Sequence, residues 1–178
     1  MRLFAFFMEI LPLAAFFIGF ELFGLMAAAG LSVVIGAVLI AVARVREGRL
    51  ALFPAYSVGL AAIFTLLALV MEAEVFIKIQ PTVFNGMFSL VLLAGWWRGT
   101  AMMKRFFAAQ FHLDDVTWMT LSLRWGLFFG VLALANELAW RGLDDRDWVM
   151  VKTFVFAPMS ALFMLAQLPL TLRGRLDK

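Results

Sequence analysis

The sequence predicts an all-α fold, a polytopic bundle of transmembrane helices with five spans and an additional N-terminal helix. Two observations support this class. Hydrophobic residues make up 65% of the 178 residues, whereas an ordinary soluble domain is roughly 45–50% apolar, and the mean hydropathy is +0.98. The apolar residues also form long unbroken runs, which lack the alternation of barrel strands; only helices or closed barrels satisfy their backbone groups in lipid.

Five apolar runs are each close to the ~20 residues that a helix needs to cross a bilayer. They cover residues 24–43, 50–70, 81–97, 121–140 and 151–172. No linker, repeat or low-complexity tract separates them, so we expect residues 1–178 to form a single integral membrane domain in direct contact with the lipid bilayer.

The N-terminal residues 3–20 are apolar but are interrupted by Glu9 and Pro12. We expect a re-entrant or interfacial helix here, and a sixth span is the alternative. A cleaved signal peptide fits less well, because Glu9 breaks the apolar stretch and Arg2 alone supplies the positive charge before it.

Basic residues are distributed unevenly among the connections between runs. The first and third connections and the C-terminal tail are richer in Lys and Arg than the second and fourth connections. Cytoplasmic loops carry the excess of positive charge in membrane proteins. The chain is therefore predicted to be a multi-pass membrane protein with a cytoplasmic C-terminus.

Small residues recur at helical spacing on two faces, which allows another helix to approach closely. The first face carries Gly24, Ala28, Ser32 and Gly36, and the second carries Gly126, Gly130 and Ala133 and ends at Glu137. We expect both faces to pack within the chain, and an oligomer interface is the alternative.

Polar side chains interrupt the third apolar run and the residues just before it. Steps of three and four residues place Thr82, Asn85 and Ser89 on one helical face. Such groups are costly in lipid and should face protein or a water-filled cavity. By the predicted topology they share one end of the bundle with polar groups of the last two spans. The predicted polar cluster comprises Lys78, Gln80, Thr82, Asn85, Asn136, Glu137 and Lys152.

The polar cluster fits two roles. In the first, Glu137 is ionised between Lys78 and Lys152, and the three side chains tie their helices together as a clamp. In the second, the same groups bind a ligand or carry a proton. The sequence leaves both roles open.

Catalytic signatures are absent from the sequence. It contains neither GxSxG nor HExxH, no cysteine, and a single histidine, His112. The Asp114–Asp115 and Asp144–Asp145 pairs lack further ligands at a metal-binding spacing, and helix caps or solvated loops explain them better. We therefore expect no enzymatic activity, no cofactor, no metal and no nucleic-acid partner.

Residues 100–111 are amphipathic and basic. We expect them to lie along the cytoplasmic membrane surface, with Lys104 and Arg105 toward anionic headgroups. Arg124 and Gln167 lie near the cytoplasmic ends of their helices, where we expect them to act as interfacial anchors.

Four motifs occur in order along nearly the whole chain. They are FIKIQPTVFNGMF at 76–88, LSLRWGLFFGVLALANELAW at 121–140, DWVMVKTFVF at 147–156 and QLPL at 167–170. With these motifs the chain resembles the bacterial intracellular septation protein A family, also called inner membrane-spanning septation proteins. The residues that match the family pattern are Lys78, Pro81, Thr82, Asn85, Arg124, Trp125, Asn136, Glu137, Trp140, Trp148, Val149 and Lys152, while Gln80 and Val151 replace a usual Lys and Phe.

The resemblance implies a five-span inner membrane protein that is needed for septation, cell shape and envelope integrity. It also implies contacts with membrane proteins of the division and elongation machinery, and no established enzyme activity. Two functional hypotheses follow. The first is a non-enzymatic scaffold in envelope biogenesis, and the alternative is a small carrier of a lipid or polar solute that uses the polar cluster.

Overall fold

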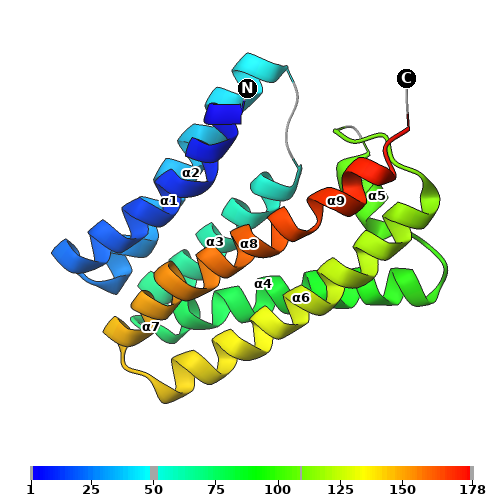
Figure 1. The fold of residues 1–178 in the computed structure, drawn as a ribbon. Helices are drawn as coiled ribbons and strands as arrows, with labels where there is room; N and C mark the ends of the chain where they lie inside the picture. The colour runs from blue at the N-terminus through cyan, green and yellow to red at the C-terminus, as the bar shows by residue number, and fades with distance from the viewer. Residues whose placement is uncertain (1, 49–51, 109, 177–178) are drawn as a thin grey trace. The chain divides into compact units, whose positions relative to one another are not determined.

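Helices make up nearly all of the described chain. The computed structural model describes residues 2–48, 52–108 and 110–176, and within them no β-strand occurs. The elements, shown in Figure 1, are α1 (Arg2–Phe23), α2 (Leu25–Glu47), α3 (Leu52–Met71), α4 (Val75–Trp97), α5 (Met102–Phe107), α6 (Asp115–Gly142), α7 (Asp145–Val151), the π-helical η1 (Lys152–Phe156), α8 (Ala157–Ala166) and α9 (Leu168–Arg173).

Five segments of the described chain are long and apolar enough to cross a membrane. They are α2, α3, α4, α6 and the run Asp145–Arg173, which α7, η1, α8 and α9 form together. The stretch Leu11–Phe23 of α1 is a shorter apolar helix. The predicted polytopic bundle of five spans with an additional N-terminal helix is thereby confirmed. The re-entrant, interfacial and six-span placements of α1 stay predictions.

Three spans begin six residues earlier than the apolar runs that predict them. In α6 and in the last span, polar first turns extend the helix beyond its apolar part. The side chain of Asp114 caps α6 by accepting a 2.7 Å hydrogen bond from the backbone N–H of Thr117, and Asp144 caps α7 in the same way through Asp147 at 2.8 Å. In α4 the extension places Pro81 inside the helix rather than at its start.

The chain divides into two compact units, Met1–Pro81 and Thr82–Lys178. Helix α4 runs through the boundary, because its first turns belong to the first unit and the rest belongs to the second. The single integral domain expected from the sequence stays a prediction. The two units are described separately below.

In the first unit, α1 and α2 form a helical hairpin and lie side by side (Figure 1). Gly24 joins them with a φ of 82°, a conformation that favours glycine. A methyl group added at Gly19 would lie 3.0 Å from Cα of Ala28, which is fully buried. Further along α2, a methyl group at Gly36 would lie 2.8 Å from a methyl group of Val58 in α3. Ala28 and Gly36 thus lie at close helix contacts, whereas Gly24 makes the turn.

In the second unit, α4 and α6 pack in antiparallel orientation along the small-residue face of α6. A methyl group added at Gly126 would lie 2.8 Å from Cδ2 of Leu93, and one at Gly130 would lie 3.0 Å from Oγ of Ser89. A methyl group added at Gly86 of α4 would lie 4.0 Å from Cβ of Ala133. Residue numbers fall along α6 as they rise along α4, which fixes the antiparallel register.

Helix α5 covers part of the basic segment at residues 100–111, and it packs against α6 on one side. Met103 is buried, and its backbone N–H donates to Oγ of Ser122 at 3.2 Å. On the exposed side, Nζ of Lys104 lies 2.7 Å from the carboxylate of Asp115. This segment is therefore attached to the start of α6 by both apolar and polar contacts.

We predict that Gly126→Val separates α4 from α6, because the added side chain overlaps Leu93. Overpacking of this kind lowers the free energy of unfolding by about 1–3 kcal/mol. Gly142→Val, at the other end of the same helix, is the matched control, since an added Cβ meets no atom within 4 Å there. Denaturant titration of both variants in detergent micelles measures the difference, and equal stability of the two would contradict this packing.

Candidate functional site

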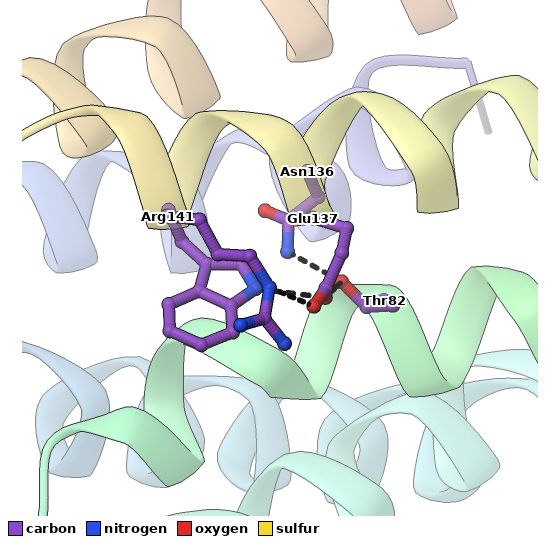
Figure 2. Close-up of polar contacts among 5 residues, drawn as sticks. Thr82, Asn136, Glu137 and Arg141 are labelled. Carbon is purple, nitrogen blue, oxygen red and sulfur yellow. Dashed lines mark hydrogen bonds and ion pairs between the residues drawn. The ribbon is translucent and has the colours of Figure 1, made fainter.

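Three members of the predicted polar cluster meet between α4 and α6. Thr82 projects from α4, and Asn136 and Glu137 project toward it from α6 (Figure 2). They meet because Glu137 continues the small-residue face of α6, where the close approach of the two helices brings their side chains within hydrogen-bonding distance. The sequence-based expectation that these three residues converge therefore agrees with their positions.

The hydroxyl group of Thr82 lies at the centre of this arrangement. Its oxygen accepts a hydrogen bond from Nδ2 of Asn136 at 2.9 Å, and the hydroxyl donates to Oε2 of Glu137 at 3.1 Å. A hydroxyl can act as donor and acceptor at once, so one side chain of α4 serves two consecutive residues of α6.

The carboxylate of Glu137 accepts two further hydrogen bonds from its own helix. Nε1 of Trp140 donates to Oε2 at 2.8 Å, and Nε of Arg141 donates to Oε1 at 2.6 Å, which also makes an ion pair. The Arg141 guanidinium in turn lies over the ring of Trp140, 4.5 Å from its centroid. These spacings of three and four residues place all three side chains on one face. The side chain of Glu137 is only 25% exposed, so its negative charge is stabilised mainly by these donors and less by solvent.

On the other side of Thr82, the network continues into the last span. Asn136 is almost fully buried, and its Oδ1 accepts a hydrogen bond from Nε1 of Trp148 at 3.1 Å. Trp148, in α7, is also completely buried. Nζ of Lys152 lies 4.9 Å from the centroid of the Trp148 ring, a cation–π contact. These hydrogen bonds therefore connect α4, α6 and α7. We call the residues that make them the Thr82 relay: Thr82, Asn136, Glu137, Trp140, Arg141 and Trp148.

The other predicted members of the polar cluster are Lys78, Gln80, Asn85 and Lys152. Lys152 begins η1 and contacts the ring of Trp148, while the ion pair of Glu137 is made with Arg141. Asn85 lies on α4, one turn beyond Thr82. Lys78 and Gln80 belong to the first unit, at the start of α4, and their part in the cluster stays a prediction.

Sequence reasoning missed two donors of the Thr82 relay. Trp140 and Trp148 are typical of the aromatic belt at a membrane surface, yet their indole N–H groups donate to Glu137 and to Asn136. For Trp140 the signal was present, because it lies three residues after Glu137. For Trp148 no local signal existed, because its contact depends on how α7 returns against α6.

Chemically, the Thr82 relay is suited to holding helices together. Its donors and acceptors are complementary, and a hydrogen-bonded network whose members are satisfied rigidifies its surroundings. Among the residues that the structure describes, no group of three or more His, Cys, Asp or Glu side chains is arranged to hold a metal ion. The arrangement offers a fixed carboxylate and a polar tie between helices.

We predict that Thr82→Val destabilises the protein by about 1–3 kcal/mol, because it leaves the buried amide of Asn136 and the partly exposed carboxylate of Glu137 without their shared partner. Valine keeps the shape of threonine and removes only the hydroxyl. Thr82→Ser keeps the hydroxyl and is the matched control, so it should lose much less stability. Chemical unfolding in micelles, followed by tryptophan fluorescence, compares the two. A valine variant as stable as the serine variant would show that the hydroxyl contributes nothing.

Comparisons with known proteins agree on one family. The family model described as "Intracellular septation protein A" matches residues 4–177. A protein of Mesorhizobium japonicum named inner membrane-spanning protein YciB is 39% identical over 128 residues, which cover 72% of this chain and 57% of that protein. Proteins of the same name from Sinorhizobium medicae and Agrobacterium fabrum are 35% and 33% identical, over 85% and 84% of this chain and 72% and 74% of their own lengths. No solved structure matches the chain.

Proposed function

Because this chain belongs to the intracellular septation protein A family, we propose that it acts in septation, cell shape and envelope biogenesis as a non-enzymatic scaffold of the bacterial inner membrane. The inner-membrane location is carried over from the names of its relatives. Membrane proteins of the division and elongation machinery are the proposed partners, and exposed helix faces and α5 are the proposed contact surfaces.

The observation that carries the scaffold proposal is the closed character of the Thr82 relay. Glu137 is the acidic member of the polar cluster, and three hydrogen bonds, from Thr82, Trp140 and Arg141, occupy its carboxylate, the last of them also an ion pair. A carboxylate held by donors from two helices is suited to fixing helix positions, since three of its roughly four acceptor sites already have donors. A scaffold requires a rigid helix bundle, because the surface that binds its partners must keep one shape.

The orientation follows from charge. The connection that contains α5 carries Lys104 and Arg105, and the C-terminal end of the chain carries Arg173, in the last turn of α9, and Arg175. Such basic segments stay in the cytoplasm. We therefore propose that the C-terminus is cytoplasmic and that the Thr82 relay lies toward the opposite surface. Green fluorescent protein fused to the C-terminus fluoresces only in the cytoplasm, so the fusion that reports abundance also reports this orientation.

The scaffold proposal predicts that Glu137→Gln lowers membrane abundance and capture of division proteins together, because it weakens the contacts with Trp140 and Arg141. Cell length and septum placement are measured in a strain that lacks the gene and carries either wild type or the variant. Asp147→Asn removes a carboxylate from an exposed position on α7 and is the matched control. Normal division in the strain without the gene would contradict the role in septation.

A carrier of a lipid or polar solute is the second candidate, and η1 favours it. π-Helical turns are rare and often occur at functional sites, and this one begins at Lys152. The next residue, Thr153, has a buried hydroxyl for which the described residues supply no hydrogen-bond partner. The carrier predicts that Glu137→Gln is as abundant as wild type but has lost flux in reconstituted vesicles, whereas the scaffold predicts lost abundance.

A further inference from the structure

Arg124 is a charged residue inside a membrane-length helix. It lies in α6, a span candidate, three residues after the beginning of the apolar run at residues 121–140, or about 5 Å along the helix axis. It is exposed on the surface of the helix. A cation at this depth must reach a polar partner or the headgroup region, because burial of an unpaired charge in lipid is costly.

The Arg124 side chain is held in place by a buried amide. Its Nη1 donates to Oε1 of Gln167 at 3.1 Å, and only 7% of Gln167 is exposed. The amide of Gln167 is itself fixed, because its Nε2 donates to the backbone carbonyl of Phe163 at 3.2 Å. The guanidinium is thus positioned from both α6 and α8.

Aromatic packing keeps these two helices together beside Arg124. The rings of Phe128 and Phe163 are stacked with centroids 4.0 Å apart, and Trp125 meets Phe163 edge-on at 5.0 Å. Edge-on ring pairs such as Trp125 and Phe163 add stability beyond their buried area. Arg124 therefore lies beside aromatic side chains that pack α6 against α8.

The Gln167 contact supplies no negative charge to Arg124. An amide oxygen is neutral, and a guanidinium has five N–H donors in a planar fork. Among the described residues, the hydrogen bond to Gln167 is the one that Arg124 makes. Nearby in the same unit, the ammonium group of Lys104 is paired with Asp115, whereas no carboxylate of the described residues pairs with Arg124.

We propose that Arg124 and Gln167 form a binding site for the phosphate group of a membrane phospholipid. Two N–H groups of the Arg124 guanidinium pair with two phosphate oxygens, which is the arrangement that arginine favours with phosphate. Trp125 and Phe163 line the adjacent part of the lipid. Arg124 lies near the boundary of the apolar run. Lipid phosphates lie at the same depth, between the acyl chains and water. This lipid site is separate from the Thr82 relay, and it does not depend on the scaffold role.

The test uses the full-length protein, delipidated in detergent, with palmitoyl-oleoyl phosphatidylglycerol added as the probe. Native mass spectrometry counts the lipids retained by wild type, Arg124→Gln and Gln167→Glu. The second variant loses the Nε2 donor to Phe163 but places a carboxylate beside Arg124, which neutralises the positive charge. Arg105→Gln, which removes one charge from an exposed position on α5, is the control.

We expect the wild type and Arg105→Gln to retain one phosphatidylglycerol with equal affinity. Arg124→Gln and Gln167→Glu should bind it at least tenfold more weakly, a change of about 1.4 kcal/mol. Thermal unfolding of Gln167→Glu close to that of wild type keeps this variant informative if Arg124→Gln fails to fold.

Three results would overturn the proposal. Equal retention by wild type and Gln167→Glu would show that the charge of Arg124 is not used. Equal retention of diacylglycerol, which has no phosphate, would assign the binding to acyl chains alone. Displacement of the lipid by inorganic phosphate at millimolar concentration would indicate a site for soluble phosphate instead.

Discussion

The hydrogen bonds of the Thr82 hydroxyl are the interaction on which the second unit depends. They require α4 and α6 to approach closely, since the hydroxyl must reach Asn136 and Glu137 at 2.9 and 3.1 Å. Small residues at positions 126, 130 and 133 of α6 permit that approach, because side chains of α4 occupy the space beside them. The polar contact and the glycine contacts are therefore parts of one constraint. Lipid offers no hydrophobic driving force between helices, so close packing and polar contacts together hold such a pair.

The same constraint explains how a carboxylate and an amide persist in an apolar helix. Glu137 is tolerated because two donors of its own helix and one of α4 accompany it. Asn136 is tolerated because Trp148 satisfies its oxygen and Thr82 accepts from its nitrogen. A partly satisfied network in a low-dielectric site is worse than an apolar contact, so the six residues of the Thr82 relay act as a unit. At the other end of α6, Arg124 lacks such a set of partners within the described residues, which is why we assign it a lipid phosphate.

Much of this arrangement was predictable from periodicity. Spacings of three and four residues identified the packing face of α6, and the order of spans placed Thr82 at the same end as Glu137. The family, the helical class and the number of membrane-length segments followed from motifs and apolar runs. The apolar runs alone begin later than three of the helices, because hydropathy gives no weight to polar first turns, whereas the helix cap expected from the Asp114–Asp115 pair is confirmed at Asp114.

Other features depend on tertiary structure and leave no local trace in the sequence. Gly24 continues a row of small residues, but its φ of 82° assigns it to the turn between α1 and α2. Trp148 looks like a membrane-surface residue until α7 places it in the interior against Asn136. The sequence indicated that Arg124 and Gln167 share one end of the bundle, whereas their contact depends on the stacked rings of α6 and α8.

The most direct test of this account is a double-mutant cycle between Thr82 and Glu137. The free energies of unfolding of wild type, Thr82→Val, Glu137→Leu and the double variant are measured in the same micelles. Residues in one hydrogen-bond network couple by about 0.5–3 kcal/mol, and the account predicts a coupling in that range. Additivity within about 0.3 kcal/mol would contradict the claim that these two side chains hold α4 to α6.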